Sequence, residues 1–170
     1  MINFMEHFQP VQAVFPTSAN GARVGDYVLM ENCHAIWCVT HFGAKVSGGC
    51  VITHEVARDF AGTGSTVLST GIQTWSAIGV GTTQNVKEVF TARTSSPAGY
   101  ALPASAAGST YSIVISRFDP ASLISTQSSN THYCVKFATM GNADNTLASM
   151  YYLDTRYKGA THLLATTSST

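Results

Sequence analysis

Hydrophobic and polar residues alternate with a period of two along several short segments, and turn residues separate these segments. The clearest case is residues 110–118, TYSIVISRF, where the odd positions 111–117 fall on one face and the even positions 112–118 on the other. Such alternation is typical of a β-strand, because successive side chains point to opposite faces. We therefore expect a strand here.

Further segments show the same alternation or a β-branched and aromatic composition, which strands favour. We expect strands at 25–32, 34–42, 50–60, 72–80, 85–94, 131–140 and 147–159, with a short one inside the loop at 66–69. The last two long strands, joined by the turn GNADNT, predict a β-hairpin. Asp119 as N-cap and Pro120 at the first helical position predict one short helical turn.

No segment of twelve or more residues shows the apolar stripe of an amphipathic helix. The pattern therefore predicts an all-β fold, an antiparallel β-sandwich or jelly-roll-like barrel with an N-terminal extended arm. We divide the chain into an arm (1–24), a single β-sandwich domain (25–159) and a C-terminal tail (160–170). Pro10 and Pro16 are expected to stop any regular element in the arm.

The arm carries three aromatic residues, Phe4, Phe8 and Phe15, which we expect outside the sandwich. Apolar residues in such a place must be covered by the body of the subunit or by a neighbour. An arm exchanged between subunits commonly locks an assembly. These three residues are therefore the candidate partner-binding residues.

Charge is scarce and balanced. Charged residues make up 11% of the chain, nine basic and nine acidic, against about a quarter in an ordinary soluble domain. Two long stretches, 60–86 and 94–116, contain no Asp, Glu, Lys, Arg or His. A nearly uncharged surface gives little repulsion between copies, so it suits a protein held in a packed assembly.

Several function classes are disfavoured by the same observations. No basic patch is visible, so we expect no nucleic-acid partner. No apolar run approaches 18 residues, so we expect no membrane span. Glu6 and His7 lie where a signal peptide needs an apolar region, so we expect the protein to be made in a cytosol.

The cysteines and histidines offer one candidate metal site. Cys33, His34, Cys38 and His41 lie close in sequence, with Cys50 and His54 behind them. The ligand types suit zinc, but the spacing does not fit a zinc knuckle, and an odd separation puts Cys33 and Cys38 on opposite faces of a strand. We therefore favour no metal, and read the four cysteines as buried free thiols.

Catalytic and cofactor motifs are also weak. There is no G-x-S-x-G elbow, and GTGSTVLSTG lacks the G-K-[ST] ending of a phosphate-binding loop. We expect no catalytic residues and no cofactor. Trp37, Trp75 and Tyr100 could form a platform for a sugar, but we favour the core for the two tryptophans and a loop anchor for Tyr100.

Two blocks of residues resemble a known class of proteins. The first is GDYVLMEN (25–32), followed by HAIWCVTHFGA and VITHEVARD. The second is DPASL (119–123), followed by HYCVKFAT and NTLASMYYLDTRYKG. In pattern and order, residues 25–159 resemble small virion structural proteins of tailed bacteriophages.

The resemblance implies a decoration or cement protein, often a homotrimer, that sits on the outer surface of the major capsid protein lattice and braces the head. It would be made in the host cytoplasm and end in the virion. An alternative is a head-fibre base, neck or tail-tip module that binds carbohydrate or a receptor. A third interpretation is a hydrolase whose site we do not recognise.

Overall fold

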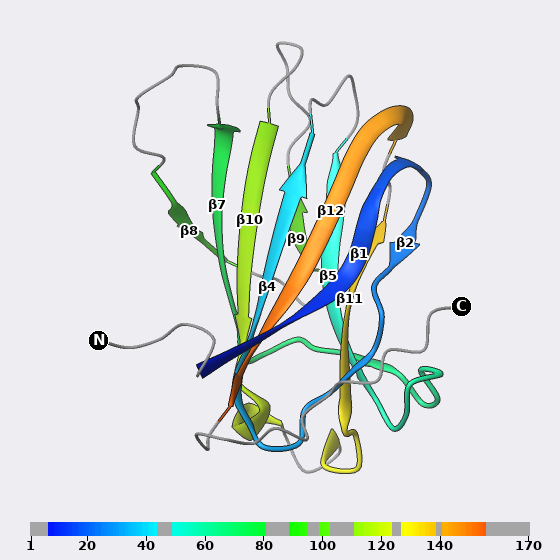
Figure 1. The fold of residues 1–170 in the computed structure, drawn as a ribbon, viewed down its shortest axis with the longest axis vertical. Coiled ribbons are helices and arrows are strands. Elements are labelled where there is room, and N and C mark those ends of the chain that lie inside the picture. Colours follow the sequence, from blue (N-terminus) through cyan, green and yellow to red (C-terminus); the bar gives the residue numbers. More distant parts are fainter. Residues whose placement is uncertain are drawn as a thin grey trace.

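The computed structural model describes residues 7–43, 49–80, 89–94, 99–102, 111–123, 127–138 and 141–155. These residues form two β-sheets that pack face to face, with antiparallel strand pairs throughout (Figure 1). The prediction of an all-β antiparallel sandwich is confirmed. The predicted tail and Phe4 lie outside the described residues.

Sheet A is the sheet that carries the longest strands. Its strand order is β1-β12-β4-β10-β7-β8. The strands are β1 (Phe8–Asn20), β4 (Cys33–Phe42), β7 (Ile72–Val80), β8 (Thr91–Arg93), β10 (Tyr111–Phe118) and β12 (Gly141–Thr155). In Figure 1 β7, β10, β4 and β12 rise side by side, and β1 passes in front of their lower ends before it runs alongside β12.

Sheet B is built from shorter strands around β11 (His132–Ala138) and β5 (Cys50–Ala57). β2 (Arg23–Val24) and β3 (Val28–Leu29) pair with β11, while β6 (Thr66–Val67) and β9 (Tyr100–Leu102) pair with β5. A one-turn 3-10 helix, η1 (Pro120–Ser122), follows β10. Asp119 caps it by accepting a 2.9 Å hydrogen bond from the Ala121 amide, as the sequence predicted.

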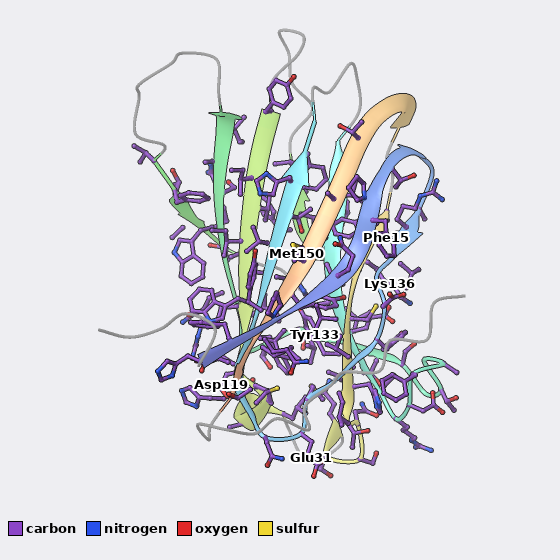
Figure 2. The ribbon with its side chains drawn as sticks, viewed as in Figure 1. Phe15, Glu31, Asp119, Tyr133, Lys136 and Met150 are labelled. Atoms are coloured by element: carbon purple, nitrogen blue, oxygen red, sulfur yellow. The ribbon has the colours of Figure 1, made fainter. Side chains whose placement is uncertain are left out.

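A cluster of aromatic rings joins the two sheets at the centre of the core. Tyr133 of β11 is fully buried (labelled in Figure 2) and stacks on Phe118 of β10, with ring centroids 5.3 Å apart. Tyr151 of β12 meets the same ring edge-on at 5.5 Å, and His54 of β5 stacks on it at 5.8 Å. Aromatic pairs in these geometries add to the stabilisation that burial gives.

The expectation that Pro10 and Pro16 would interrupt the N-terminal segment was wrong. β1 runs through both prolines and pairs with β12, with register shifts before and after Val14. Proline lacks an N–H, but β1 is the edge strand of sheet A, where a missing donor leaves no partner unsatisfied. Residues 8–20, together with β2, therefore belong to the sandwich and not to a separate arm.

The predicted hairpin between residues 131–140 and 147–159 was also wrong. β11 lies in sheet B, β12 lies in sheet A, and the segment read as the turn GNADNT is the first part of β12, paired with β1. Tyr133 and Tyr151 therefore meet across the core instead of side by side. Turn residues indicate where a strand ends, but they do not say whether the next strand pairs with it or crosses to the facing sheet.

Gly99, which precedes β9, allows that strand to approach β5 closely. Its φ is +93°, and a Cβ built there would lie 2.4 Å from the carbonyl oxygen of Ile52. We expect Gly99→Ala to lower the free energy of unfolding by about 2–3 kcal/mol, from backbone strain and displacement of β9. Urea denaturation measures this change.

Gly21 provides the matched control for that substitution. Its φ is +104°, but a Cβ there would meet no atom within 4 Å. Gly21→Ala should therefore cost only the strain of the left-handed conformation, about 1 kcal/mol. Equal losses for the two variants would contradict the role given to the close approach of β9 and β5.

Candidate docking surface on the outer face of sheet A

The inner face of sheet A holds large core residues such as Phe42 and Leu147, with small polar side chains among them. Ser149 bonds Thr40 at 3.0 Å and contacts the Cys38 thiol at 3.3 Å, and all three residues are buried. Ser76 accepts a 3.0 Å hydrogen bond from the hydroxyl of Tyr100. The hydrogen bonds between these side chains satisfy their polar groups, so burying them costs little free energy.

The opposite side, which we call the outer face, also carries large apolar residues. Alternation along each strand and the pairing register place them together. The outer face consists of Phe8, Pro10, Gln12 and Pro16 of β1; Ala148, Met150, Tyr152 and Asp154 of β12; Ala35, Trp37, Val39 and His41 of β4; Tyr111, Ile113, Ile115 and Arg117 of β10; and Gln73, Trp75 and Ala77 of β7. Figure 2 labels Met150 on β12.

An aromatic pair lies at the middle of this face. The rings of Trp37 and Trp75 stack with centroids 6.1 Å apart and planes inclined by 21°. The guanidinium of Arg117 lies over Trp37, 5.8 Å from the ring centroid, a cation–π contact. Both tryptophans are half-buried.

This arrangement corrects the sequence interpretation of the three aromatic residues. Trp37 and Trp75 were expected in the core and lie on the outer face instead, while Tyr100, expected as a loop anchor, is a core residue of β9 that is 7% exposed. Alternation shows that two sets of residues face opposite ways, but not which set faces the other sheet. The structure brings the two tryptophans together and puts Tyr100 on the other side of sheet A.

Two neighbouring hollows mark one half of the outer face. One, of about 490 Å³, extends between Pro16, Gly43, Tyr111 and Thr146. The other, of about 160 Å³, extends between Gln12, Val39, Met150 and Tyr152. The two share Pro16, His41 and Ala148, and neither is lined by Asp, Glu, Lys or Arg.

The residue types of the outer face are those of protein–protein contacts. Interface cores are enriched in aromatic residues, Met and Arg and depleted in Lys and Glu. Trp37, Trp75, Tyr152, Met150 and Arg117 fit the first group, and the outer face as defined contains no Lys and no Glu. The face is therefore suited to docking on another protein surface.

The residue pattern alone did not identify the outer face, although it placed part of that face correctly. The odd positions of 111–117 were assigned to one face, but the neighbours that complete the surface come from β12, β4 and β7, far apart along the chain. Of the predicted partner-binding residues, Phe15 is 66% exposed on β1 and Phe8 is half-buried at the start of the same strand. Phe8 pairs with Asp154 at the edge of the outer face, whereas Phe15 is not among the residues of that face.

The four cysteines are buried thiols that form no disulfide, as the sequence predicted. Cys33 and Cys38 were expected on opposite faces of a strand, but both belong to the core cluster, because the pairing of β12 with β4 shifts register beside Cys33. Among the residues that the structure describes, no three His, Cys, Asp or Glu gather as metal ligands would. His34 and His41 are exposed.

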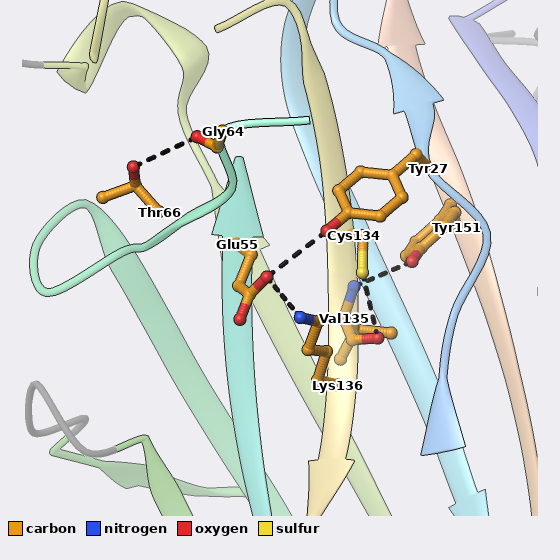
Figure 3. A network of polar contacts seen from close by, with 8 residues as sticks. All are labelled: Tyr27, Glu55, Gly64, Thr66, Cys134, Val135, Lys136 and Tyr151. Atoms are coloured by element: carbon orange, nitrogen blue, oxygen red, sulfur yellow. Dashed lines mark hydrogen bonds and ion pairs between the residues drawn. The ribbon is translucent and has the colours of Figure 1, made fainter. Parts of the chain in front are cut away.

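A second polar cluster lies on sheet B (Figure 3). Glu55 of β5 forms a 2.6 Å ion pair with Lys136 of β11 and accepts a 3.3 Å hydrogen bond from the hydroxyl of Tyr27. Cys134 lies beside them, and its burial raises the pKa of the thiol to about 12. A thiol that stays protonated is a poor nucleophile and metal ligand, so this cluster fits a structural role.

Within the described residues, no helix has the length and apolar character that crossing a bilayer demands.

Comparison with known proteins gives little guidance. No protein-family model matches the sequence, and no curated protein matches it. Three solved chains are similar, from the structures of the T13 IBDV viral particle (10% identity, TM-score 0.22), the infectious bursal disease virus Gx strain (8%, 0.23) and its Gt strain (7%, 0.21). They are matched over 95–96% of this chain, which spans less than half of each of them (43–45%). TM-scores this low establish neither a shared fold nor a function.

Proposed function

We propose that this chain is a non-enzymatic virion structural protein, most specifically a decoration (cement) protein of a tailed-bacteriophage head. In this role it binds the outer surface of the major capsid protein lattice and stabilises the shell. The observation that carries the proposal is the outer face of sheet A, which presents bulky apolar residues although a sandwich with one solvated face would place polar residues there.

Two features of the sequence support the same role. The order of the blocks in residues 25–159 resembles that of phage head proteins, and the balance of nine acidic against nine basic residues gives the surface little net repulsion. Many copies on a lattice combine weak individual contacts by avidity, so a moderately apolar face is sufficient for stable attachment.

The test uses shells assembled from the major capsid protein of the phage whose genome encodes this chain. Purified chain is mixed with the shells, the shells are sedimented, and the bound chain is quantified. We expect binding that saturates at a fixed ratio to the capsid subunit, and shells that unfold at a higher temperature when decorated. Failure of the chain to sediment with these shells would overturn the proposed role.

A substitution at the centre of the outer face sharpens the test. Ile115→Lys places a charge that must be desolvated if the face is covered, so we expect shell binding to weaken by about tenfold or more. Val67→Lys is the matched control, since Val67 is 41% exposed on β6 of the other sheet and pairs across the strands with Glu55. Equal binding by the two variants would remove the outer face from the mechanism.

A second candidate function is a head-fibre base, neck or tail-tip module that binds carbohydrate. The specific observation in its favour is the Trp37–Trp75 pair, because sugars stack on flat aromatic rings and Arg117 beside them can donate hydrogen bonds. Titration with soluble oligosaccharides, followed by tryptophan fluorescence, separates the two functions. Saturable binding of a glycan without binding to shells would favour this module.

A further inference from the structure

We infer that the outer face of sheet A binds the same face of a second copy of this chain, forming a two-fold dimer with its axis along β4. The inference rests on the proposed function only in treating this face as an assembly surface: in solution a second copy covers it, and the dimer must dissociate before the face can bind a shell. A trimer was expected from the resemblance to phage proteins; the geometry of this face points to a dimer instead.

Strand order makes a two-fold axis along β4 self-consistent. When two copies of sheet A stack face to face about this axis, β12 of one copy lies over β10 of the other, and β1 lies over β7. Every contact then occurs twice, as a two-fold interface requires. Sheets stack at about 10 Å in this way inside ordinary β-sandwiches.

The two charged residues of the outer face become complementary under this axis. Arg117 lies on β10 and Asp154 on β12, on opposite sides of β4. Arg117 and Tyr152 each lie directly opposite Trp37 in the strand pairing. The axis therefore places the Arg117 of one copy above the partner's Tyr152. Asp154 lies two residues farther along the same strand as Tyr152. A long arginine side chain spans the remaining ~7 Å along the strand, which gives one attractive pair on each side of the axis.

The shape of the face also fits its own copy. Tyr111 is 52% exposed at one end of β10. Thr146 of β12 lies at the same level along the sheet, on the other side of β4, and lines the larger hollow. The axis therefore directs the Tyr111 ring of one copy toward the hollow of the other. Protruding side chains that fill pockets are the usual energetic centres of interfaces.

The size of the face is that of a modest dimer interface. Five strands, each seven residues long on this face, cover a flat footprint of about 550 Å². A standard interface buries about 800 Å² on each partner, measured over the relief of the side chains, which exceeds the flat footprint. We therefore expect a dimer that dissociates on dilution, and not a permanent one.

Sedimentation velocity of the purified full chain over a range of concentrations tests this inference. We expect a reversible monomer–dimer equilibrium. Arg117→Asp places like charges opposite each other and should weaken the dimer by about tenfold. Asp154→Arg should weaken it similarly, and the double variant, which exchanges the two charges, should restore it.

Circular dichroism and a thermal melt of each variant show that it folds, and Val67→Lys, on sheet B, should leave the dimer unchanged. A chain that is monomeric at all concentrations, a trimer, or a dimer insensitive to both single charge reversals would overturn the inference. Because no shell enters the experiment, the two proposals fail separately. A dimer that does not bind shells would contradict only the decoration role, and a monomer that binds shells would contradict only the dimer.

Discussion

Tyr133→Ala lowers the free energy of unfolding by about 4 kcal/mol, the largest effect of a single substitution that we expect in this chain. Tyr133 is fully buried, and its ring touches Phe118 and Tyr151 of sheet A and His54 of sheet B. Its removal leaves a cavity between the sheets and takes away the hydroxyl that bonds Nδ1 of His54 at 2.6 Å. Both losses act on the folded state alone.

Urea denaturation monitored by circular dichroism measures this loss. Tyr111→Ala, measured at a concentration where the chain is monomeric, is the matched control: Tyr111 is 52% exposed at the end of β10, so the substitution removes the same atoms without opening a cavity. We expect it to cost less than about 1 kcal/mol. A small loss at Tyr133, similar to that at Tyr111, would mean that the two sheets do not close on this aromatic cluster.

Acidification removes about 3 kcal/mol of stability through His54, the second large effect that we expect. His54 lies in the core with 4% exposure, and its Nε2 has no hydrogen-bond partner among the residues that the structure describes. Burial lowers the pKa of its imidazole from 6.5 to about 4. Between these values the unfolded chain binds a proton that the folded chain does not, so stability is complete above pH 6.5 and falls as the pH approaches 4.

The measurement is the free energy of unfolding as a function of pH, for the native chain and for His54→Phe. The variant loses the bond to Tyr133 at every pH, so its starting stability is lower, but it should lose about 3 kcal/mol less between pH 6.5 and 4. Burial also lowers the pKa of His132, which leaves a residual decline in the same direction. Identical pH profiles for the two chains would show that His54 does not titrate in this way.

Strand positions were accessible from the sequence because they depend on local residue pattern. β7 occupies the predicted residues 72–80, and the even positions of 112–118 face one side as predicted. The assignment of strands to sheets was not accessible in this way. This assignment determines whether GNADNT is a hairpin turn or part of a strand. If the strands that carry Tyr133 and Tyr151 lay in one sheet, GNADNT would join them as a turn, but they lie in two sheets and GNADNT begins β12.

The outer face was missed for a related physical reason. Trp37 and Trp75 have the composition of core residues, and a single sequence places such residues in the core by default. The inner side of the same sheet holds large core residues and, among them, Ser149, Thr40 and Cys38, whose hydrogen bonds to one another make their burial tolerable. Only the paired register of β12, β4 and β10 shows which of the two alternating sets faces away from sheet B, and that set also contains large apolar residues.

Tryptophan fluorescence tests the central claim, that the outer face of sheet A is covered on assembly, most directly. Trp37 and Trp75 are the only two tryptophans of the chain, and both lie on this face. We expect acrylamide to quench their emission in dilute, dissociated protein, and to quench it much less once the protein is assembled, either with its own copies or on shells. Equal quenching in the dissociated and assembled states would contradict the assignment of this face to assembly.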